Sequence, residues 1–449
     1  MPRPRRPRSD YPALVEQVRA AGVVGMGGAG FPTHTKLRPR LAAVIVNGAE
    51  CEPLLACDRH LLERHPALIL DGAVRVAQAT GAAEVVLAVK RKNRALAEAF
   101  TRLDAPLPLR AVLMDDVYPS GDEFFVIRDA CRTTLPPGAI PVEHGLFVSN
   151  AATFKAISDA YAGVPLTHRF VSVCGAVARP VTVEAPIGTR FGALLSAAGG
   201  SACDSPRLLE GGILMGELAT SDSVVRKTTS AVVVLPDTHP AVLERTRPLS
   251  FSVKLAEHIC CQCVKCTELC SRNLLGHEIE PHKAMRLVGS AHDYRELPMP
   301  SLWQCSGCGL CSLVACPFDL GVRRLILEAR KALPRPPAQA GVPRHRAEAG
   351  LFLVPTPRLI QRLRLGPYNT PNVFTGALPM PAELRIPCKQ HAGAPAMPVV
   401  AAGQSVQAGQ LIARAPDGAL GANVHAPTAG RVAAVGADIV IEVGESVSR

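Results

Sequence analysis

Hydrophobic and polar positions along the first third of the chain predict strands and helices in alternation. The run AAVIVN at residues 42–47 is rich in β-branched side chains and predicts a buried strand, and EVVLAVK at residues 84–90 predicts a second. Residues 61–80 and 93–103 have the apolar spacing of helices. Strands and helices that alternate at this spacing are typical of a layered α/β domain.

The pattern changes further along the chain. Residues 170–236 predict short strands, turns and one helix, as in a small β-grasp module, and residues 333–350 form a proline-rich stretch typical of a linker. We therefore expect a multidomain α/β protein with these parts: a disordered arm (1–10), an α/β domain (11–165), a β-grasp domain (166–245), a cysteine-rich domain (250–332), a linker (333–383) and a C-terminal domain (384–449).

Composition and charge exclude several classes of protein. The chain has 449 residues, enough for about three domains of ordinary size, and no apolar run long enough to span a bilayer. Its net charge of +11 includes four arginines in the first ten residues, which lack the apolar core of a secretory signal. Aromatic residues make up only 4% and do not alternate with a basic tract, which argues against nucleic-acid binding. We expect a cytoplasmic protein that is not integral to a membrane.

A glycine-rich stretch, GVVGMGGAGFPTHTKL, occupies residues 22–37. Glycine lets backbone N–H groups approach an anion closely, so this stretch is a candidate phosphate cradle. It lacks the Gly-Lys-Ser/Thr of a Walker loop and fits the dinucleotide pattern only loosely. From these residues alone, a phosphate cradle and an ordinary flexible turn both remain open.

Eight of the fifteen cysteines fall into two short runs. The first run has the C-x2-C-x2-C-x3-C spacing of bacterial ferredoxins, and the second has the same spacing with one residue inserted before its last cysteine. Thiols this dense, in a long chain without a secretory signal, indicate metal binding rather than disulfides. The two runs are Cys260, Cys263, Cys266 and Cys270, followed by Cys305, Cys308, Cys311 and Cys316.

In ferredoxins with two clusters, the fourth cysteine of each run ligates the cluster of the other run. We therefore expect two 4Fe-4S clusters, each held by three cysteines of one run and the last cysteine of the other. The expected sets are Cys260, Cys263, Cys266 and Cys316, and Cys305, Cys308, Cys311 and Cys270. Structural zinc is the alternative, although zinc sites usually consist of two separated Cys-x2-Cys knuckles.

Two polar segments complete a set of motifs in chain order. VNGAECEP at residues 46–53 follows the first predicted strand, and YPSGDE at residues 118–123 forms a polar turn. With the glycine-rich stretch they resemble the FMN- and NADH-binding domain shared by the flavoprotein subunit of complex I and RnfC. The resemblance extends over most of the chain, because a β-grasp (SLBB) domain, two ferredoxin motifs and a barrel-sandwich hybrid follow in the order of the PduS-type cobalamin reductases.

The C-terminal segment resembles a biotinyl or lipoyl barrel-sandwich domain, with Val-Gly-Gln turns and the stretch HAPTAGRV. A carrier domain of this fold needs a lysine at its hairpin tip, but the chain has no lysine after Lys389. We therefore expect an interaction or packing module rather than a swinging arm.

The resemblance implies roles for individual residues. Phe31, Glu50 and Glu52 would border the reacting flavin and nicotinamide. The residues implied to bind FMN and NADH are Gly25, Gly27, Gly28, Gly30, Phe31, Lys36, Asn47, Glu50, Tyr118, Gly121, Asp122, Glu123, Asn150 and Thr153. Ala49 departs from the complex I pattern, which has an aspartate at this position, so part of the nucleotide contact differs here.

The resemblance implies an NADH-dependent oxidoreductase with FMN and two 4Fe-4S clusters. It would pass single electrons to cobalamin, or to a cobalamin-handling protein, for reactivation of a B12 enzyme. The expected setting is the cytoplasm, within a bacterial microcompartment, as an oligomer, with a shell protein or an adenosyltransferase as a further partner. The arginine-rich arm is either a solvated tail or a shell-docking element.

Three alternatives remain open at this point. An RnfC-like protein would recycle NADH or feed electrons to another partner in a microcompartment. A non-catalytic redox scaffold would use its β-grasp and barrel modules for docking. Membership of a membrane-bound Rnf complex is disfavoured because the barrel segment comes last in this chain, whereas RnfC usually carries it first.

Overall fold

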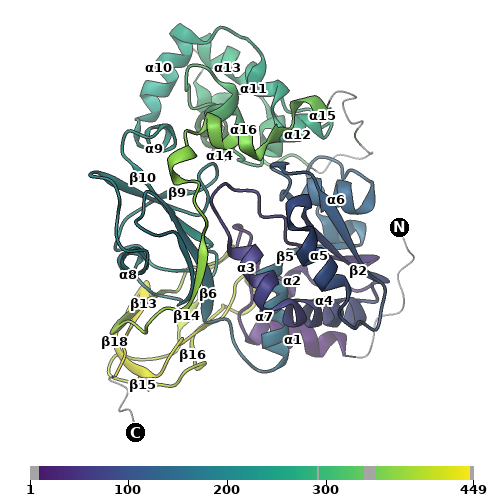
Figure 1. Cartoon of the computed structure of the whole chain (residues 1–449), viewed down its shortest axis with the longest axis vertical. Helices are drawn as coiled ribbons and strands as arrows, with labels where there is room; N and C mark the ends of the chain where they lie inside the picture. Colours follow the sequence, from purple (N-terminus) through teal and green to yellow (C-terminus); the bar gives the residue numbers. More distant parts are fainter. Residues whose placement is uncertain (1–9, 291–292, 338–342, 344–348, 445–449) are drawn as a thin grey trace.

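The computed structural model describes residues 10–290, 293–337, 343 and 349–444. Figure 1 shows four regions: an α/β domain, a β-grasp sheet, a helical cysteine-rich region and a C-terminal pair of small sheets. Except for its last residue, the arm expected at residues 1–10 lies outside the described residues. No helix of the described chain is long and apolar enough to cross a membrane.

The N-terminal domain is built on a parallel sheet of four strands in the order β3-β2-β1-β5. The strands predicted at 42–47 and 84–90 are confirmed. The strands and helices of this domain are β1 (Ala43–Asn47), β2 (Glu84–Lys90), β3 (Leu109–Met114), β5 (Leu146–Asn150), α1 (Tyr11–Ala20), α2 (Thr33–Lys36), α3 (Cys57–Arg64), α4 (Pro66–Thr80), α5 (Arg94–Thr101), α6 (Glu123–Cys131) and α7 (Ala151–Tyr161).

Helices cover both faces of this sheet. One core combines α1, α4 and α7 with Val44 and Val46 of β1, and a second packs α6 against Ile45 on the other face. Helices α4 and α7 lie so close that a Cβ at Gly72 would stand 1.9 Å from the carbonyl oxygen of Phe154. Because β1 and β5 are parallel and in register, Asn47 and Asn150 end side by side at the carboxyl edge of the sheet, where ligands bind in open α/β sheets.

The β-grasp domain is a mixed sheet in the order β12-β7-β6-β10-β8-β9, with α8 in the core on one face. Its elements are β6 (His168–Gly175), β7 (Val181–Pro186), α8 (Phe191–Ala197), β8 (Pro206–Glu210), β9 (Glu217–Ala219), β10 (Ala231–Pro236) and β12 (Val373–Ala377). Helix α9 (Pro240–Thr246) leads into the cysteine-rich region.

The segment expected as a linker, 333–383, contains ordered elements. Strand β12 pairs with β7 of the β-grasp sheet, and β11 (Val354–Pro355) pairs with β4 (Val117–Tyr118). Helix α15 (Ala349–Phe352) precedes β11, and α16 (Thr356–Arg362) buries Leu359 completely. The prolines and arginines of this segment drew attention away from these few apolar residues, which return the chain to its neighbours.

The cysteine-rich region is helical. Helices α10 (Leu249–Ile259), α13 (Pro281–Gly289) and α14 (Val322–Ala332) share one hydrophobic core with cysteines of both runs. The short helices α11 (Lys265–Glu268) and α12 (Ser271–Leu274) lie beside the first run. The loops that carry the cysteines therefore rest on a small apolar core.

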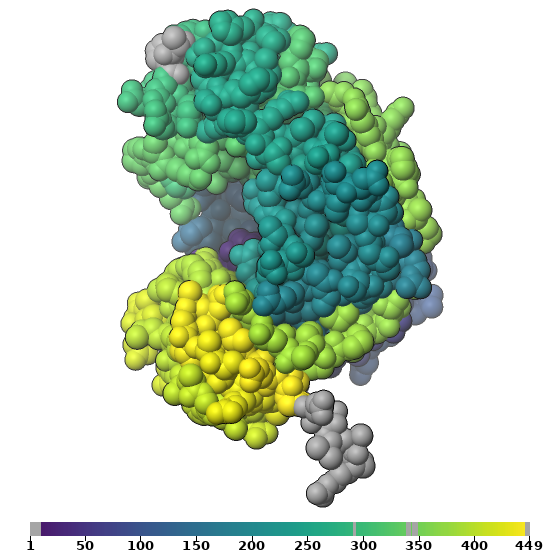
Figure 2. Space-filling view, turned by 90° about the vertical axis from the view of Figure 1, so that its left-hand side faces the viewer, coloured from purple at the N-terminus to yellow at the C-terminus, as the bar shows by residue number. Residues whose placement is uncertain are grey.

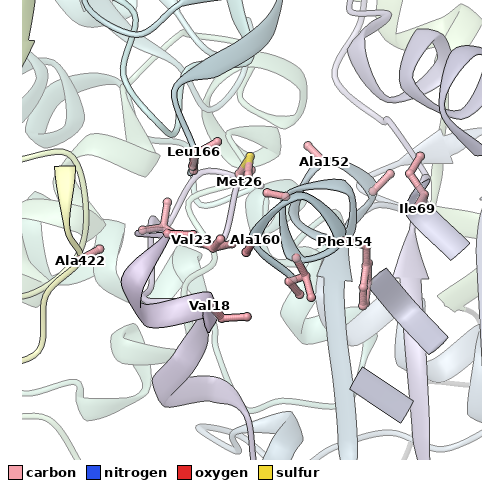
Figure 3. Packing of buried hydrophobic residues seen from close by; sticks show 14 of the residues in the cluster. Val18, Val23, Met26, Ile69, Ala152, Phe154, Ala160, Leu166 and Ala422 are labelled. Carbon is pink, nitrogen blue, oxygen red and sulfur yellow. The ribbon is translucent and has the colours of Figure 1, made fainter. Parts of the chain in front are cut away.

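The C-terminal barrel has two antiparallel sheets, in the orders β13-β19-β18-β15 and β14-β16-β17. Its strands are β13 (Glu383–Pro387), β14 (Met397–Pro398), β15 (Ser405–Val406), β16 (Leu411–Arg414), β17 (Val424–His425), β18 (Gly430–Val435) and β19 (Asp438–Glu442). Its buried residues belong to the same hydrophobic cluster as those of the N-terminal domain, as Figure 3 shows with Met26 and Ala422. The barrel is therefore packed onto the α/β domain.

Candidate functional site

The glycine loop, residues 22–32, connects α1 to α2 and folds back on itself. The amide of Gly25 donates to the carbonyl of Phe31 at 2.8 Å, and Val24 forms an isolated bridge with Pro32. The amide of Met26 donates to the hydroxyl of Thr153 at 3.1 Å, which ties the loop to the first turn of α7. The loop therefore lies against the carboxyl edge of the parallel sheet.

The middle of the glycine loop is open. Gly28 has a φ of +119°, and a Cβ added there would meet no atom within 4 Å. The neighbouring Phe31 exposes 41% of its surface, much for an aromatic side chain. Space beside a glycine backbone and an exposed aromatic ring fit a nucleotide with a flat ring system. In Figure 2, purple atoms from the start of the chain lie at the floor of a hollow between the cysteine-rich region and the barrel.

Glu50 and Asp58 place two carboxyl groups next to the loop that follows β1. Glu50 accepts from the amide of Asp58 at 3.4 Å, at the N-terminus of α3. Both carboxylate oxygens of Asp58 accept from the side-chain amide of Asn150, at 2.9 and 2.8 Å. Burial, and then the Asp58 carboxylate, raise the pKa of Glu50, while burial raises the pKa of Asp58. Such a pair holds a proton near neutral pH, as groups at functional sites often do.

Glu52 lies away from Glu50, although only one residue separates them. Its carboxylate accepts from the amides of Leu214 and Met215, at 3.1 and 2.9 Å, in the β-grasp domain. A Cβ at Gly212 would stand 1.9 Å from the Glu52 carboxyl carbon, so glycine is required there. Glu52 therefore joins two domains, and its predicted place beside nicotinamide stays a prediction.

The turn at residues 118–123 contacts both the polar segment after β1 and the cysteine-rich region. Asn47 donates to the carbonyl of Gly121 at 2.9 Å. The Tyr118 hydroxyl, fully buried, donates to the carbonyl of Cys308 at 2.8 Å. Asp122 caps α6 and forms an ion pair of 2.9 Å with Arg272. The turn therefore connects the sheet edge to the second cysteine run.

Lys36, expected near phosphate, is already engaged. Its ammonium group donates to Glu123 at 2.9 Å and to the carbonyl of Val148 at 2.6 Å. The pair crosses from α2 to α6 and is half-buried. Lys36 and Glu123 therefore hold the glycine loop against the sheet in this structure.

The eight cysteines of the two runs line two cavities. The inner cavity is lined by Cys270, Cys305, Cys308 and Cys311, and the outer cavity by Cys260, Cys261, Cys263, Cys266 and Cys316. Each cavity combines three cysteines of one run with the last cysteine of the other, the grouping expected from the spacing. Cys261 is an additional thiol at the outer cavity.

The thiols of each cavity face one another. Burial, and then Cys316, Cys263 and Cys260, raise the pKa of Cys266 to about 12. Burial and the thiol of Cys308 likewise raise the pKa of Cys270 to about 12. Within the described ranges, no three His, Cys, Asp or Glu side chains converge closely enough for a single metal ion. Four thiols around a common space are the donor set of a 4Fe-4S cluster, so the residues fit that group.

Two functional candidates were missed from the sequence. Asp58 gave no signal, because an acidic residue in the first turn of a helix is ordinary. Arg169 of β6 is buried and contacts the sulfur of Met26 in the glycine loop, and its pKa is lowered by burial. A charged residue inside the apolar run of β6 was a usable signal for Arg169.

Comparison with known proteins accounts for each region. Family profiles match the Nuo51 FMN-binding domain at residues 18–159, the SLBB domain at 170–216, a 4Fe-4S dicluster domain at 259–321 and the RnfC barrel sandwich hybrid domain at 369–448. The expected fold class is therefore confirmed, with an FMN-binding domain and a 4Fe-4S domain in one chain.

More distant relatives share part of this arrangement. Among solved structures, the NAD+-reducing [NiFe]-hydrogenase in its H2-reduced state matches with a TM-score of 0.47 at 21% identity, covering 72% of this chain and 63% of that one. The RnfC-type component of the ion-translocating oxidoreductase complex of Pseudomonas aeruginosa is 33% identical over 288 residues, which cover 61% of this chain and 35% of that protein.

Two relatives match from end to end. The cobalamin reductase PduS of Citrobacter freundii is 37% identical over 447 residues, covering 95% of both chains. The cobalamin reductase PduS of Salmonella typhimurium is 39% identical over 424 residues, covering 94% of both chains. With this identity over nearly the whole length, the chain belongs to the PduS cobalamin reductase family.

Proposed function

We propose that this chain is an NADH-oxidising iron–sulfur flavoprotein that passes single electrons to cobalamin. The observation that carries the proposal is the end-to-end match to two proteins named cobalamin reductase, in a chain that also has an FMN-binding domain and two four-cysteine cavities.

The glycine loop and its neighbours would hold the flavin and the dinucleotide. Backbone amides around Gly28 can approach a phosphate because no side chain intervenes. The exposed ring of Phe31 offers an apolar surface for a flat ring system, and the Glu50 carboxyl group can bind a ribose or nicotinamide group. A bound flavin accepts two electrons from NADH and releases them singly, which suits iron–sulfur clusters, carriers of one electron each.

The cysteines would hold two clusters, in the two sets that line the cavities. Arg323 donates to the carbonyl of Gly307 at 2.9 Å and Arg330 to that of Cys305 at 2.7 Å, so two cations lie beside the inner cavity. Positive charge and hydrogen bonds near cluster sulfurs favour the reduced state. The chain thereby favours uptake of electrons at the inner cavity.

The proposed setting is a bacterial microcompartment in the cytoplasm, where this chain would act as an oligomer with a shell protein or an adenosyltransferase. The relatives' names support cobalamin as the acceptor, and the remaining partners follow from the resemblance alone.

The decisive experiment uses the full chain, reconstituted with FMN, iron and sulfide under anaerobic conditions. NADH is added, and reduction of aquacobalamin is followed by its absorbance, with a generic dye as a parallel acceptor. We expect both acceptors to be reduced. Reduction of the dye without any reduction of cobalamin would contradict the proposal.

A second candidate is an RnfC-like electron-transfer protein that serves another partner. The match to the RnfC-type component of the Pseudomonas aeruginosa complex, over 61% of this chain, favours it. NADH oxidation with the dye alone is its expected signature. A chain that retains no FMN would instead support the non-catalytic scaffold.

A further inference from the structure

The C-terminal barrel is the one domain that the proposed function leaves without a role. It lacks the lysine of a carrier domain, yet it shares a hydrophobic core with the N-terminal domain. Several of its polar contacts are made with the glycine loop. The question is what these contacts do for that loop.

Lys227 joins three domains at the start of the glycine loop. This lysine belongs to the β-grasp domain and is fully buried. Its ammonium group donates to the carbonyl of Gly22, at 2.7 Å, and to the carbonyl of Asn423 in the barrel. Its own amide donates to the side chain of Gln390, also in the barrel, at 3.0 Å. One residue thus connects the loop, the β-grasp domain and the barrel.

The other end of the loop is held from the same side. The amide of Ala392 in the barrel donates to the carbonyl of Gly30 at 2.9 Å. A Cβ at Gly30 would stand 2.9 Å from the methyl group of Thr228 and 3.2 Å from the Cα of His391. The barrel therefore lies directly against Gly30, whereas Gly28 between the two ends faces open space.

The ammonium group of Lys227 donates to carbonyl oxygens, and no ion pair of this lysine occurs among the residues that the structure describes. Burial lowers its pKa to about 7. A buried ammonium group without a carboxylate is costly unless it is well hydrogen-bonded. Its place between two backbone segments is that of a cross-link rather than of a surface charge.

We propose that Lys227 is a positioning residue that anchors the glycine loop to the barrel, so that the barrel serves as a brace for the nucleotide-binding loop. The inference rests on the proposed binding of FMN by this loop. A braced loop keeps its amides in place for the phosphate, which lowers the entropy lost on binding. A barrel without a carrier lysine thereby has a function in cofactor binding.

The test compares Lys227→Met with the wild-type full chain, both carrying their iron–sulfur clusters. Methionine keeps the apolar stem and removes the ammonium group. The dissociation constant of FMN is measured by quenching of flavin fluorescence, and exchange of the backbone amides at residues 22–32 by hydrogen–deuterium exchange. We expect the dissociation constant to rise about tenfold, the loss of one charge-assisted hydrogen bond, with faster exchange in the loop and unchanged iron content.

Lys389→Met is the matched control, because Lys389 is exposed at the edge of the same barrel, and it should bind FMN as the wild type does. An unchanged dissociation constant and unchanged loop exchange in Lys227→Met would overturn the inference.

A second variant serves if Lys227→Met is recovered unfolded. Gln390→Met removes the acceptor for the Lys227 amide and leaves the ammonium group in place. It should weaken FMN binding about threefold, and no change would overturn the inference. A wild-type chain that binds no FMN would instead refute the proposed function.

Discussion

The inner and outer cysteine cavities present the same donors in opposite surroundings. At the inner cavity, Cys308 and Cys311 are buried, and the loop around them contacts the α/β domain through Tyr118. At the outer cavity, Cys261 and Cys263 are exposed, and Phe318 exposes 43% of its surface. Four thiols therefore define the kind of site, whereas the neighbouring domains define how it is used.

The difference follows from which loop each domain covers. The second run is enclosed by the β-grasp domain as well, since a Cβ at Gly309 would stand 2.8 Å from the carbonyl of Leu214. In the first run, Cys261 and Cys263 are exposed instead. We expect the inner cavity to respond to changes at the glycine-loop domain, and the outer cavity to be the one that a large acceptor can approach.

The largest contrast is expected between Cys308→Ser and Cys263→Ser. Each variant should lose about half of its iron, since each removes a ligand of one cluster of two. The cluster absorbance that remains should bleach with NADH in Cys263→Ser and stay unbleached in Cys308→Ser, because the contacts to the glycine-loop domain belong to the inner cavity. Bleaching in Cys308→Ser but not in Cys263→Ser would reverse the comparison.

The ion pair between Arg272 and Asp122 is the next largest effect. Both side chains are nearly buried, and the pair joins the inner cavity's neighbourhood to α6. Arg272→Met leaves Asp122 unpaired and should lower the free energy of unfolding by about 3 kcal/mol, measured by urea denaturation. Arg295→Met is the control: it removes an exposed pair with Asp293 and should cause no measurable change. Equal effects of the two variants would deny the inner contact its importance.

Tyr118→Phe is expected to act more weakly at the same place. The variant keeps the buried ring and removes the hydrogen bond to the carbonyl of Cys308. The free energy of unfolding should fall by about 1 to 2 kcal/mol, and a chelator should extract iron faster than from the wild type. Iron loss confined to the outer cavity, identified by the thiols that become alkylated, would speak against this contact.

Cys261→Ser is expected to have the smallest effect. Cys261 lines the outer cavity but lies outside the ferredoxin spacing. The variant should keep its full iron content and its rate of cobalamin reduction. A loss of about half of the iron would show that Cys261, rather than a cysteine of the regular spacing, is a ligand.

Local patterns predicted the order of domains, the strands around the glycine loop and the grouping of the cysteines. These depend on β-branched runs and short spacings, which a sequence displays directly. The contacts between domains were not predictable in this way. Glu50 and Glu52 look equivalent along the chain, but only Glu52 reaches the amides of Leu214 and Met215. The partner of Tyr118 lies 190 residues away, and no local pattern encodes such a distance.

The most direct test is an anaerobic titration of the reconstituted wild-type chain with NADH, followed at the absorbance bands of the flavin and of the clusters. Because the glycine loop and both cysteine cavities belong to one connected structure, the account predicts that the flavin and cluster bands bleach in the same sample without an added mediator. FMN that remains bound while neither band bleaches, or flavin bleaching with a cluster band that never changes, would contradict it.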